Sequence, residues 1–234
     1  MRHDGRAFDA LRPIKIQRRF TATPAGSVLW SQGKTVLLAT ASVTPEVPKW
    51  FPPTRAGGWV TAEYLMLPSS TPQRKPWPNV GHTDSRGTEI QRLIGRSLRA
   101  AVDLSKIGPN TIALDCQVLQ ADGGTRTASI CAAFIALADA LAAINAKAGL
   151  TQATAAVSVG LLNGEPLLDL DYAEDSKADV DLNVAMTASG KFVEIQGSAE
   201  NGDGISHAQL GQMLDLGAAG CRKLLELQAE CLVK

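Results

Sequence analysis

The polar motif with the clearest chemical potential is Asp122-Gly123-Gly124-Thr125-Arg126-Thr127, between a predicted strand and a predicted helix. Its paired glycines allow the backbone to turn sharply and to bring bare N–H groups close to a ligand. The helix that follows would add unsatisfied N–H donors and the positive end of its dipole, which attract anions. Gly124, Thr125 and Arg126 are therefore candidate phosphate-binding residues, and Arg126 is also a candidate catalytic residue. The alternative is an ordinary turn in which a threonine caps the helix.

Arg86 is a second candidate for holding an anion. It ends a long loop just ahead of a predicted helix, where a guanidinium can clamp a phosphate with two parallel hydrogen bonds. Arg92 and Arg96 follow within that helix, on faces other than its apolar one. A solvated helix face or subunit contacts would be the simplest explanation for them.

A run of carboxylates between residues 169 and 181 is the third place where chemistry is expected. Polar and apolar residues alternate at its end, so Asp179 and Asp181 point to one face of a strand. Asp175 can fold back from the preceding turn to join them. Such crowding is costly unless a cation offsets it, so we expect these three carboxylates to hold Mg²⁺, with Asp175 and Asp181 as catalytic residues. The earlier acids are better explained by a solvated loop: Asp169, Asp171 and Glu174.

These three features together suit phosphoryl transfer, in which positioning and charge neutralisation do most of the catalysis. Two like charges about 4 Å apart repel by roughly 4 kcal/mol at an intermediate effective dielectric. Arginines and a cation placed together would offset such repulsion. Zinc chemistry is not indicated, because His3, His82 and His207 lack metal-ligand spacing.

The composition is that of a globular protein. The chain has 234 residues, of which 45% are hydrophobic and 20% charged. This length allows one large domain or two small halves that share a core. Lys plus Arg equals Asp plus Glu, at 23 each, so the net charge is zero. An RNA-binding protein with this balance must gather its basic residues on one face.

Hydrophobic periodicity predicts the elements that position the candidate residues. Alternating runs predict strands, including a hairpin at Gln32-Gly33-Lys34 and another at Asn163-Gly164. Helical spacing of apolar residues predicts three helices, and residues 147–154 form a linker. The strands are expected at residues 14–20, 26–43, 59–66, 111–119, 156–162, 167–171, 179–187 and 191–198, and the helices at 89–105, 125–146 and 206–228. The pattern predicts a mixed α/β (α+β) fold.

The same pattern divides the chain at the linker. Residues 1–150 hold the expected phosphate site and residues 151–234 the acidic metal site, packed as one compact domain.

The cellular location follows from the cysteines and the N-terminus. Four cysteines without a CxxC pair are best explained as small buried thiols in a reducing compartment. The N-terminal residues are polar and lack the apolar core of a signal peptide. No apolar run approaches the roughly 20 residues that a membrane span needs. We therefore expect a cytoplasmic protein without membrane contact.

Several uninterrupted segments closely resemble the ribonuclease PH family, and the resemblance extends over nearly the whole chain. The segments are residues 1–6, Leu11-Arg12-Pro13, Gly58–Tyr64, Glu89–Arg99, Leu119–Thr127 and Asp175–Asn183. The resemblance implies a ribonuclease PH-type fold, similar to the ribosomal-protein domain-like fold. It also implies a ring, usually a homohexamer built as a trimer of dimers.

The resemblance implies a phosphorolytic 3′→5′ exoribonuclease, a tRNA nucleotidyltransferase. Inorganic phosphate would attack the last phosphodiester of an RNA 3′ end, usually that of a tRNA precursor, and release a nucleoside 5′-diphosphate. By resemblance, Arg86 and Gly124-Thr125-Arg126 hold the attacking phosphate, and Asp175 and Asp181 place Mg²⁺ with Asp179 in support.

The chain departs from the family pattern at two places. The arginine clamp reads Ser85-Arg86-Gly87-Thr88 rather than Gly-Arg-Thr-Met. In the loop after Leu67-Pro68, the family places several arginines that grip tRNA, but Ser69 and Trp77 replace two of them. Arg74 and Lys75 remain, and with Arg92 and Arg96 they are the candidate RNA-binding residues. Because the loop has fewer basic residues, RNA binding should be weaker and less sensitive to salt. Trp77 could stack on a base or pack within the loop.

Two other functions fit parts of the sequence. The chain could be a non-catalytic subunit of an exosome-type ring, or a nucleotide-binding regulatory domain that uses only the anion pocket. An inactive copy should have lost at least one of four residues, Arg86, Arg126, Asp175 and Asp181, and all four are present. The sequence therefore favours an active enzyme.

Overall fold

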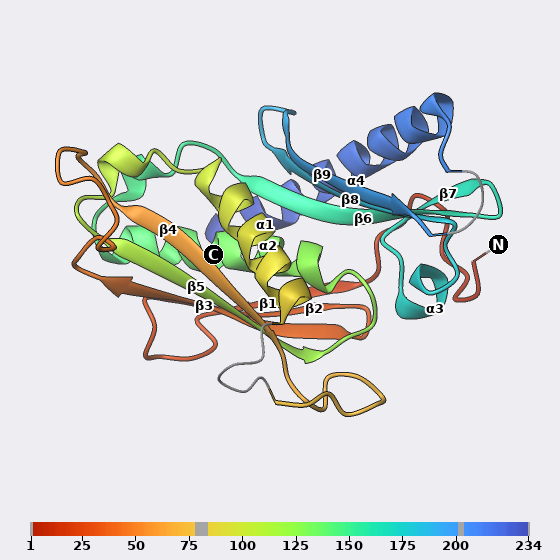
Figure 1. Ribbon diagram of the computed structural model, residues 1–234, viewed down its shortest axis with the longest axis horizontal. Coiled ribbons are helices and arrows are strands. Elements are labelled where there is room, and N and C mark those ends of the chain that lie inside the picture. The colour runs from red at the N-terminus through yellow and green to blue at the C-terminus, as the bar shows by residue number, and fades with distance from the viewer. Residues whose placement is uncertain (1, 78–83, 201–203, 234) are drawn as a thin grey trace.

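Two β-sheets form the framework of the fold in the computed structural model, which describes residues 2–77, 84–200 and 204–233 (Figure 1). The first sheet has the strand order β1-β2-β3-β5-β4. Its strands are β1 (Ile14–Arg18), β2 (Gly26–Gln32), β3 (Thr35–Thr44), β4 (Trp59–Met66) and β5 (Thr111–Gln120). β4 pairs with β5 in parallel, because the chain crosses back through α1 (Ser85–Arg99) before it enters β5.

The second sheet is antiparallel, in the order β7-β6-β8-β9. Its strands are β6 (Thr154–Leu162), β7 (Glu165–Leu168), β8 (Val180–Thr187) and β9 (Phe192–Ala199). The predicted hairpin at Asn163-Gly164 is confirmed, since both residues have positive φ angles, 52° and 81°. Such angles match the turn to the twist of the flanking strands.

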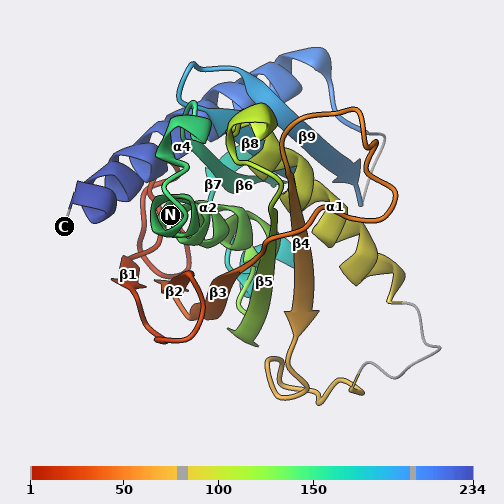
Figure 2. The ribbon, with the colours of Figure 1, turned by 90° about the vertical axis from the view of Figure 1, so that its left-hand side faces the viewer.

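The helices join the two sheets into one core. α1 and α2 (Thr125–Ala143) lie between the sheets, and α4 (His207–Val233) covers the other face of the second sheet (Figures 1 and 2). Gly217 lets α4 approach closely, because a Cβ there would lie 2.6 Å from Val184 Cγ2. One hydrophobic cluster contains residues from both halves of the chain, so the two sheets stabilise each other.

α2 is apolar on nearly all sides, as its burial between two sheets requires. By length and hydropathy it could span a membrane, so the expectation that no apolar run approaches that length was wrong, but 78% of its apolar window is buried inside the protein. It is the only described helix that meets those criteria. Its sequence is therefore explained by its place in the core.

Most predicted elements are confirmed, with differences at their ends. α1 covers Ser85–Arg99, four residues ahead of the predicted start, because the Asp84 side chain caps it by accepting a hydrogen bond from the Gly87 N–H at 3.0 Å. Arg86 therefore lies in the first turn of α1 rather than ahead of it. Of the cysteines, Cys116, Cys131 and Cys221 are buried as predicted, but Cys231 is only partly buried.

The acidic loop after β7 is not solvated, and that interpretation was wrong. Its acids are almost completely buried, with exposed fractions of 1% for Asp169, 7% for Asp171 and 3% for Glu174. Arginines from the N-terminal segment neutralise them: Arg2 contacts Glu174 at 2.5 Å and Arg12 contacts Asp169 at 2.6 Å. Because these partners are more than 150 residues apart in sequence, local composition does not reveal the pairing.

A short helix within this loop was not predicted. α3 (Tyr172–Asp175) begins with a capping box, in which the side chains of Asp171 and Glu174 each accept a hydrogen bond from the other's backbone N–H. The helix places Asp175 at its C-terminal end. The buried acids therefore support the element that carries one of the expected metal ligands.

Candidate active site

The glycine motif forms a tight turn at the N-terminus of α2, as predicted. Gly123 and Gly124 have φ angles of 75° and 63°, which favour glycine. A Cβ at Gly123 would lie 2.5 Å from the Leu170 carbonyl oxygen, so the turn also packs directly against the second half of the chain.

The alternative of a threonine cap is wrong. The N-cap residue is Gly124, and no described side chain caps the helix. The Thr125 hydroxyl lies 2.8 Å from the Tyr64 hydroxyl instead, and the Thr127 hydroxyl donates to the Gly124 carbonyl at 3.0 Å. The first N–H groups of α2 are therefore left without a side-chain partner among the described residues, which is the state that an anion site requires.

The predicted phosphate and metal residues line one cleft. Its larger part is a cavity of about 700 Å³, bounded by the loop after β4, the turn before α2 and the second sheet. A neighbouring part of about 640 Å³ extends along α1 and β9. Five residues line both parts: Arg86, Arg126, Asp175, Asp181 and Asn183. The structure thus brings the arginines and the carboxylates together from opposite halves of the chain.

Arg126 is directed toward the second sheet. Its guanidinium donates a hydrogen bond to the Gln196 side chain of β9, and the Gln196 amide donates to Glu89 on α1. Arg86, in the first turn of α1, is exposed. One arginine is therefore held by a side-chain network and the other is open to solvent within the same cleft.

The two carboxylates in the cleft carry charge that the surrounding residues only partly offset. Burial raises the pKa of Asp175 and of Asp181, and the charge of Asp181 raises that of Asp175 further, while Arg86 and Arg126 act in the opposite direction. Asp181 Oδ2 accepts a hydrogen bond from Asn183 at 3.1 Å, but its buried Oδ1 has no partner among the described residues. These oxygens have the chemistry that hard cations prefer.

Asp179 is not brought to this place. It lies just ahead of β8, where its backbone N–H donates to the Leu161 carbonyl at 2.8 Å. It lines neither part of the cleft formed by the described residues. Although Asp179 and Asp181 have the same parity along the chain, Asp179 precedes the regular strand, so the shared face expected from alternation is not realised in the cleft.

The candidate RNA-binding residues separate into two groups. Arg74 and Lys75 line the larger part of the cleft. Arg92 and Arg96 line neither part among the described residues. Arg92 is exposed on α1, and Arg96 makes a two-pronged ion pair with Glu194 of β9, at 3.0 and 2.9 Å. Trp77 is 54% exposed and lies outside the cleft lining.

Among the cleft residues that sequence reasoning missed are Ser158 and Tyr172. Ser158 lies within the buried strand β6, and its hydroxyl has no hydrogen-bond partner among the described residues. The only signal was a polar residue inside an apolar run. Tyr172 begins α3 and is 61% exposed. An aromatic ring that is exposed to solvent at the edge of a cleft can stack on a base.

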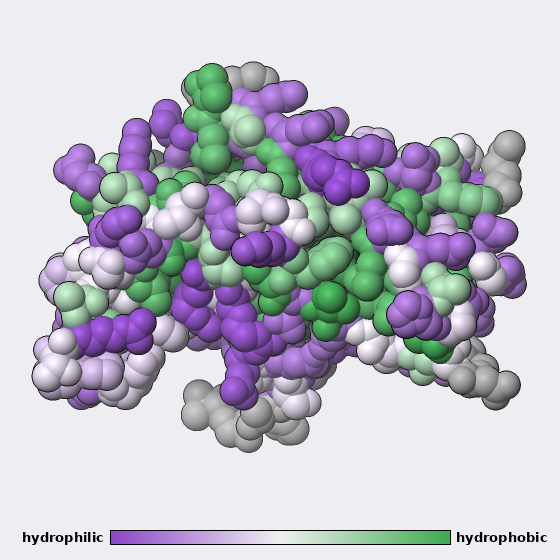
Figure 3. All heavy atoms as spheres, turned by 90° about the horizontal axis from the view of Figure 1, so that it is seen from above, coloured by the Kyte–Doolittle hydropathy of each residue, from purple (hydrophilic) through white to green (hydrophobic). Residues whose placement is uncertain are grey.

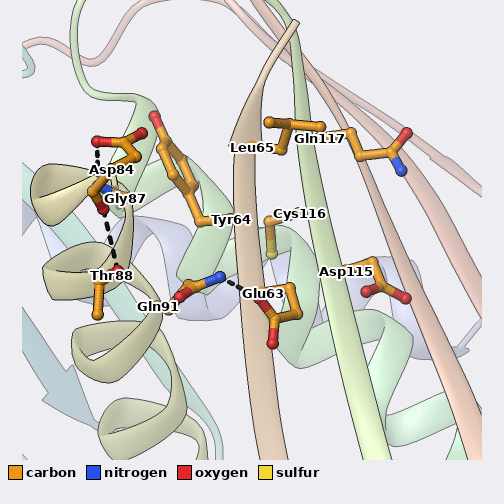
Figure 4. A pocket seen from close by; sticks show the side chains of 10 residues that line it. All are labelled: Glu63, Tyr64, Leu65, Asp84, Gly87, Thr88, Gln91, Asp115, Cys116 and Gln117. Atoms are coloured by element: carbon orange, nitrogen blue, oxygen red, sulfur yellow. Dashed lines mark hydrogen bonds between the residues drawn. The ribbon is translucent and has the colours of Figure 1, made fainter. Parts of the chain in front are cut away.

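A second pocket, of about 410 Å³, lies between α1 and strands β4 and β5 (Figure 4). Glu63, Asp84 and Asp115 give it three carboxylates. Burial raises the pKa of both Glu63 and Asp115, and the charge of Asp115 adds to the effect on Glu63. Such a pocket repels anions, so it is less suited to phosphate or RNA than the arginine-lined cleft.

The fold and the cleft define a class of enzymes that act on phosphodiesters, and comparison with known families specifies it. The family model "3′ exoribonuclease family, domain 1" matches residues 10–143, and "domain 2" of the same family matches residues 152–220. The chain belongs to the 3′ exoribonuclease family.

Curated relatives extend this match from end to end. The chain is 53% identical to the ribonuclease PH of Corynebacterium kroppenstedtii, covering 100% of this chain and 94% of that protein. It is 54% identical to the ribonuclease PH of Corynebacterium glutamicum, covering 99% and 96%. The resemblance to ribonuclease PH is therefore confirmed, and the chain is a phosphorolytic 3′→5′ exoribonuclease, an enzyme of the nucleotidyltransferase type.

Solved structures agree with the predicted fold. Rice (Oryza sativa) Rrp46 superimposes with a TM-score of 0.83 at 22% identity, covering 100% of both chains. A chain of the Archaeoglobus fulgidus exosome with RNA bound to the active site gives a TM-score of 0.81 at 24% identity, covering 96% of this chain and 91% of that one. The mixed α/β fold of the ribonuclease PH type is confirmed.

Proposed function

We propose that Arg86, Gly124, Thr125 and Arg126 hold the inorganic phosphate that attacks RNA. The observation that carries this proposal is the shared cleft, in which Arg86 and Arg126 lie with Asp175 and Asp181. An oxygen of the phosphate forms a bond to the phosphorus of the last phosphodiester. The bond from that phosphorus to the 3′ oxygen of the preceding nucleotide breaks, and that oxygen takes up a proton. The products are a nucleoside 5′-diphosphate and a shortened RNA.

The two arginines bring the attacking anion and the anionic substrate together. Each guanidinium offers donors in a fork that matches two phosphate oxygens. The N–H groups at the start of α2, which lack a side-chain cap among the described residues, add fixed donors at no cost of reorganisation. In a partly desolvated cleft, such donors offset the repulsion between the two anions.

Asp175 and Asp181 are the residues that would hold Mg²⁺. The buried, unpartnered Oδ1 of Asp181 and the raised pKa of both carboxyls, caused chiefly by burial, fit a site whose charge balance includes a cation. When bound, the ion supplies charge neutralisation at the scissile phosphodiester. Asp179, outside the cleft lining, is not included among the ligands.

The RNA 3′ end enters past the loop after β4. Arg74 and Lys75 contact its backbone phosphates, and Tyr172 offers a ring for stacking. We take the 3′ ends of tRNA precursors as the substrate, in keeping with the ribonuclease PH relatives, and the cytoplasm as the location. Arg92 and Arg96 have no place in this RNA path.

We further propose that the chain assembles as a homohexamer, a trimer of dimers. Large apolar side chains remain exposed on the second sheet, including Phe192 at 38% and Ile195 at 49% on β9. Figure 3 shows apolar surface interleaved with polar side chains on the face seen from above Figure 1. Contacts between subunits would cover such side chains.

The test of the proposed function is product identity. RNA with a 3′ extension is incubated with the protein and Mg²⁺, with and without inorganic phosphate. Nucleoside diphosphates that appear only when phosphate is present support the proposal, and EDTA should stop their release. Nucleoside monophosphates released without phosphate would mean hydrolysis and would overturn it.

A further inference from the structure

Arg12 is a buried arginine that touches the phosphate-binding turn and the acidic loop at once. The residue is 4% exposed. One guanidinium nitrogen, Nη1, donates to the Asp122 carbonyl in the turn before α2. The other, Nη2, donates to Asp169 Oδ1 at 2.6 Å, while the Arg12 backbone N–H donates to Asp169 Oδ2 at 2.7 Å. A single side chain thus links the two loops that carry the phosphate residues and the expected metal ligands.

The guanidinium also lies directly beneath Gly124. A Cβ placed on Gly124 would be 2.8 Å from Arg12 Nη2, so only glycine allows this approach. The aliphatic part of the Arg12 side chain packs closely against Gly33, because a Cβ on Gly33 would lie 2.7 Å from Arg12 Cδ. The positive charge is therefore held in one place under the turn.

We propose that Arg12 is a positioning residue for the attacking phosphate, which orients the backbone N–H groups of the turn. This inference rests on the proposed function, because it deepens the assignment of the phosphate site. Arg12 itself does not line the cleft formed by the described residues, so it acts through the turn and not by contact with substrate.

The orientation follows from the geometry of the peptide bond. In a planar trans peptide, the N–H points opposite to the C=O of the same unit. Arg12 holds the carbonyl of Asp122, so the N–H of Gly123 is turned away from Arg12. The Thr35 hydroxyl donates to the Gly123 carbonyl at 2.7 Å, which turns the N–H of Gly124 away from Thr35 in the same manner.

Thr35 reinforces the same turn from the end of the β2–β3 hairpin. Its hydroxyl oxygen also accepts a hydrogen bond from the Asp122 N–H, at 2.9 Å. Arg12 and Thr35 therefore fix three backbone groups at Asp122 and Gly123, and neither residue is in the lining of the cleft formed by the described residues. Thr35 carries no charge, so a substitution at Thr35 tests the orientation of the peptide groups without changing the charge near them.

The link to Asp169 couples the phosphate site to the carboxylates. Only a few residues separate Asp169 from α3, which ends at Asp175. The positive charge of Arg12 also lowers the pKa of Asp175, although burial and Asp181 prevail and raise it. Moving Arg12 would therefore disturb both sides of the cleft. The phosphate side would change first, because Arg12 donates to the phosphate-binding turn itself, whereas Asp169 is not one of the proposed metal ligands.

The test compares matched arginine-to-lysine changes. Arg12→Lys keeps the charge next to Asp169, but a single ammonium cannot reproduce the two arms of the guanidinium. Thr35→Val removes the hydroxyl that forms hydrogen bonds with the Asp122 N–H and the Gly123 carbonyl, while it keeps a β-branched residue in the strand. Arg18→Lys is the control, because Arg18 pairs with Asp139 at 2.5 Å, and neither residue lines the cleft of the described chain.

The measurements are kcat, the KM for phosphate, the KM for RNA, and the rise in Tm that inorganic phosphate produces without RNA. We expect Arg12→Lys and Thr35→Val to raise the KM for phosphate about tenfold. This change corresponds to the loss of one hydrogen bond between a backbone N–H and the charged phosphate. The phosphate-induced rise in Tm should shrink in parallel, while the KM for RNA stays within about twofold and Arg18→Lys matches the wild type.

An unchanged KM for phosphate in a folded Arg12→Lys or Thr35→Val protein would overturn the inference. Equal rises in both KM values would also overturn it, since they indicate general disorder of the cleft. If Arg12→Lys does not fold, Thr35→Val decides alone. Failure of the proposed function looks different: the wild-type protein itself would release no nucleoside diphosphates, while its phosphate-induced rise in Tm would still report on the turn.

Discussion

Asp181, which we propose as a metal ligand, has a cost in stability. Its side chain lies on β8 in the cleft, and one of its oxygens is buried without a partner among the described residues. Burial raises its pKa above the ordinary value of 3.8, so the ionised form is less favourable in the folded protein than in the unfolded chain. The free energy of unfolding is lowered by the full amount at a pH above the pKa of Asp181 in the folded protein. The effect disappears below pH 3.8, where Asp181 is protonated in both the folded and the unfolded state.

Asp181→Asn should therefore stabilise the metal-free protein while it stops catalysis. In EDTA at neutral pH the variant should have a higher Tm than the wild type, and the difference should vanish as the pH falls below 3.8. Thermal unfolding across this pH range measures the effect. Asp215→Asn, on the exposed side of α4, is the control and should leave both Tm and activity unchanged. A lower Tm for Asp181→Asn at neutral pH would contradict the account.

Arg126→Ala should abolish phosphate-dependent trimming without unfolding the protein. An arginine that offsets charge in phosphoryl transfer is worth about 10³-fold or more in kcat. Because Arg126 contacts Gln196 at the edge of the cleft and not the core, its loss should change Tm by only a few degrees. Single-turnover assays and thermal unfolding measure the two effects. Wild-type turnover in this variant would remove Arg126 from the site.

The residues of the site were predictable where their chemistry is unusual for their position. Arg86, Arg126, Asp175 and Asp181 were singled out from sequence, and the structure places them in one cleft. Ser158 was not, because a serine within an apolar strand does not reveal whether its hydroxyl has a partner. The partners of a buried group come from distant parts of the chain, and one sequence does not specify them.

The N-terminal segment holds the loop that carries α3 in place through buried hydrogen bonds. Arg2 donates to both carboxylate oxygens of Glu174, at 2.8 and 2.5 Å, and to the Leu168 carbonyl at 2.7 Å. Glu174 in turn belongs to the capping box of α3. A segment without regular secondary structure thus contacts the short helix that ends at Asp175.

Arg2→Ala should destabilise the protein by about 3–5 kcal/mol, because it leaves the Glu174 carboxylate buried without its main partner. Urea unfolding measures the change. Arg96→Ala removes a pair with Glu194 in which the arginine side chain is 50% exposed, and it should cost less than about 1 kcal/mol. Equal costs for the two variants would show that burial of the Arg2 pair does not determine its strength.

The acidic loop shows why the elements were predicted better than their surroundings. Strands and helices follow from local periodicity, so their existence was confirmed nearly throughout. The same local view assigned Asp169 and Glu174 to solvent, because acids in a loop are usually exposed. Their burial depends on arginines near the other end of the chain. α3 was missed for the related reason that a helix of one turn leaves no periodic pattern.

For the molecule as a whole, zero net charge makes RNA attraction a local property. The lining of the cleft contains three arginines and a lysine together with carboxylates, whereas the lining of the neighbouring pocket contains carboxylates and, among the described residues, no arginine or lysine. The affinity for single-stranded RNA should accordingly fall only moderately with salt, because few cationic residues contact the RNA. Bulk composition left this point open, because it does not show how charges are arranged in space.

Removal of Arg74 and Lys75 tests this arrangement. In the Arg74→Ala/Lys75→Ala double variant, the slope of log K against log salt for single-stranded RNA should fall by about 0.7 for each charge removed. Arg92→Ala, outside the cleft lining of the described chain, should leave the slope unchanged. Fluorescence anisotropy with a short labelled RNA over a salt series measures it. The opposite ranking would place the RNA path along α1.

We propose that free phosphate, held between the arginines and the carboxylates, is the attacking group. The most direct measurement is the fate of radiolabelled inorganic phosphate during trimming of an unlabelled RNA. We predict that the label enters the terminal phosphate of the released nucleoside diphosphates. We also predict that Arg126→Ala prevents this transfer while the protein stays folded. RNA shortened at the normal rate with all label left in inorganic phosphate would contradict the account.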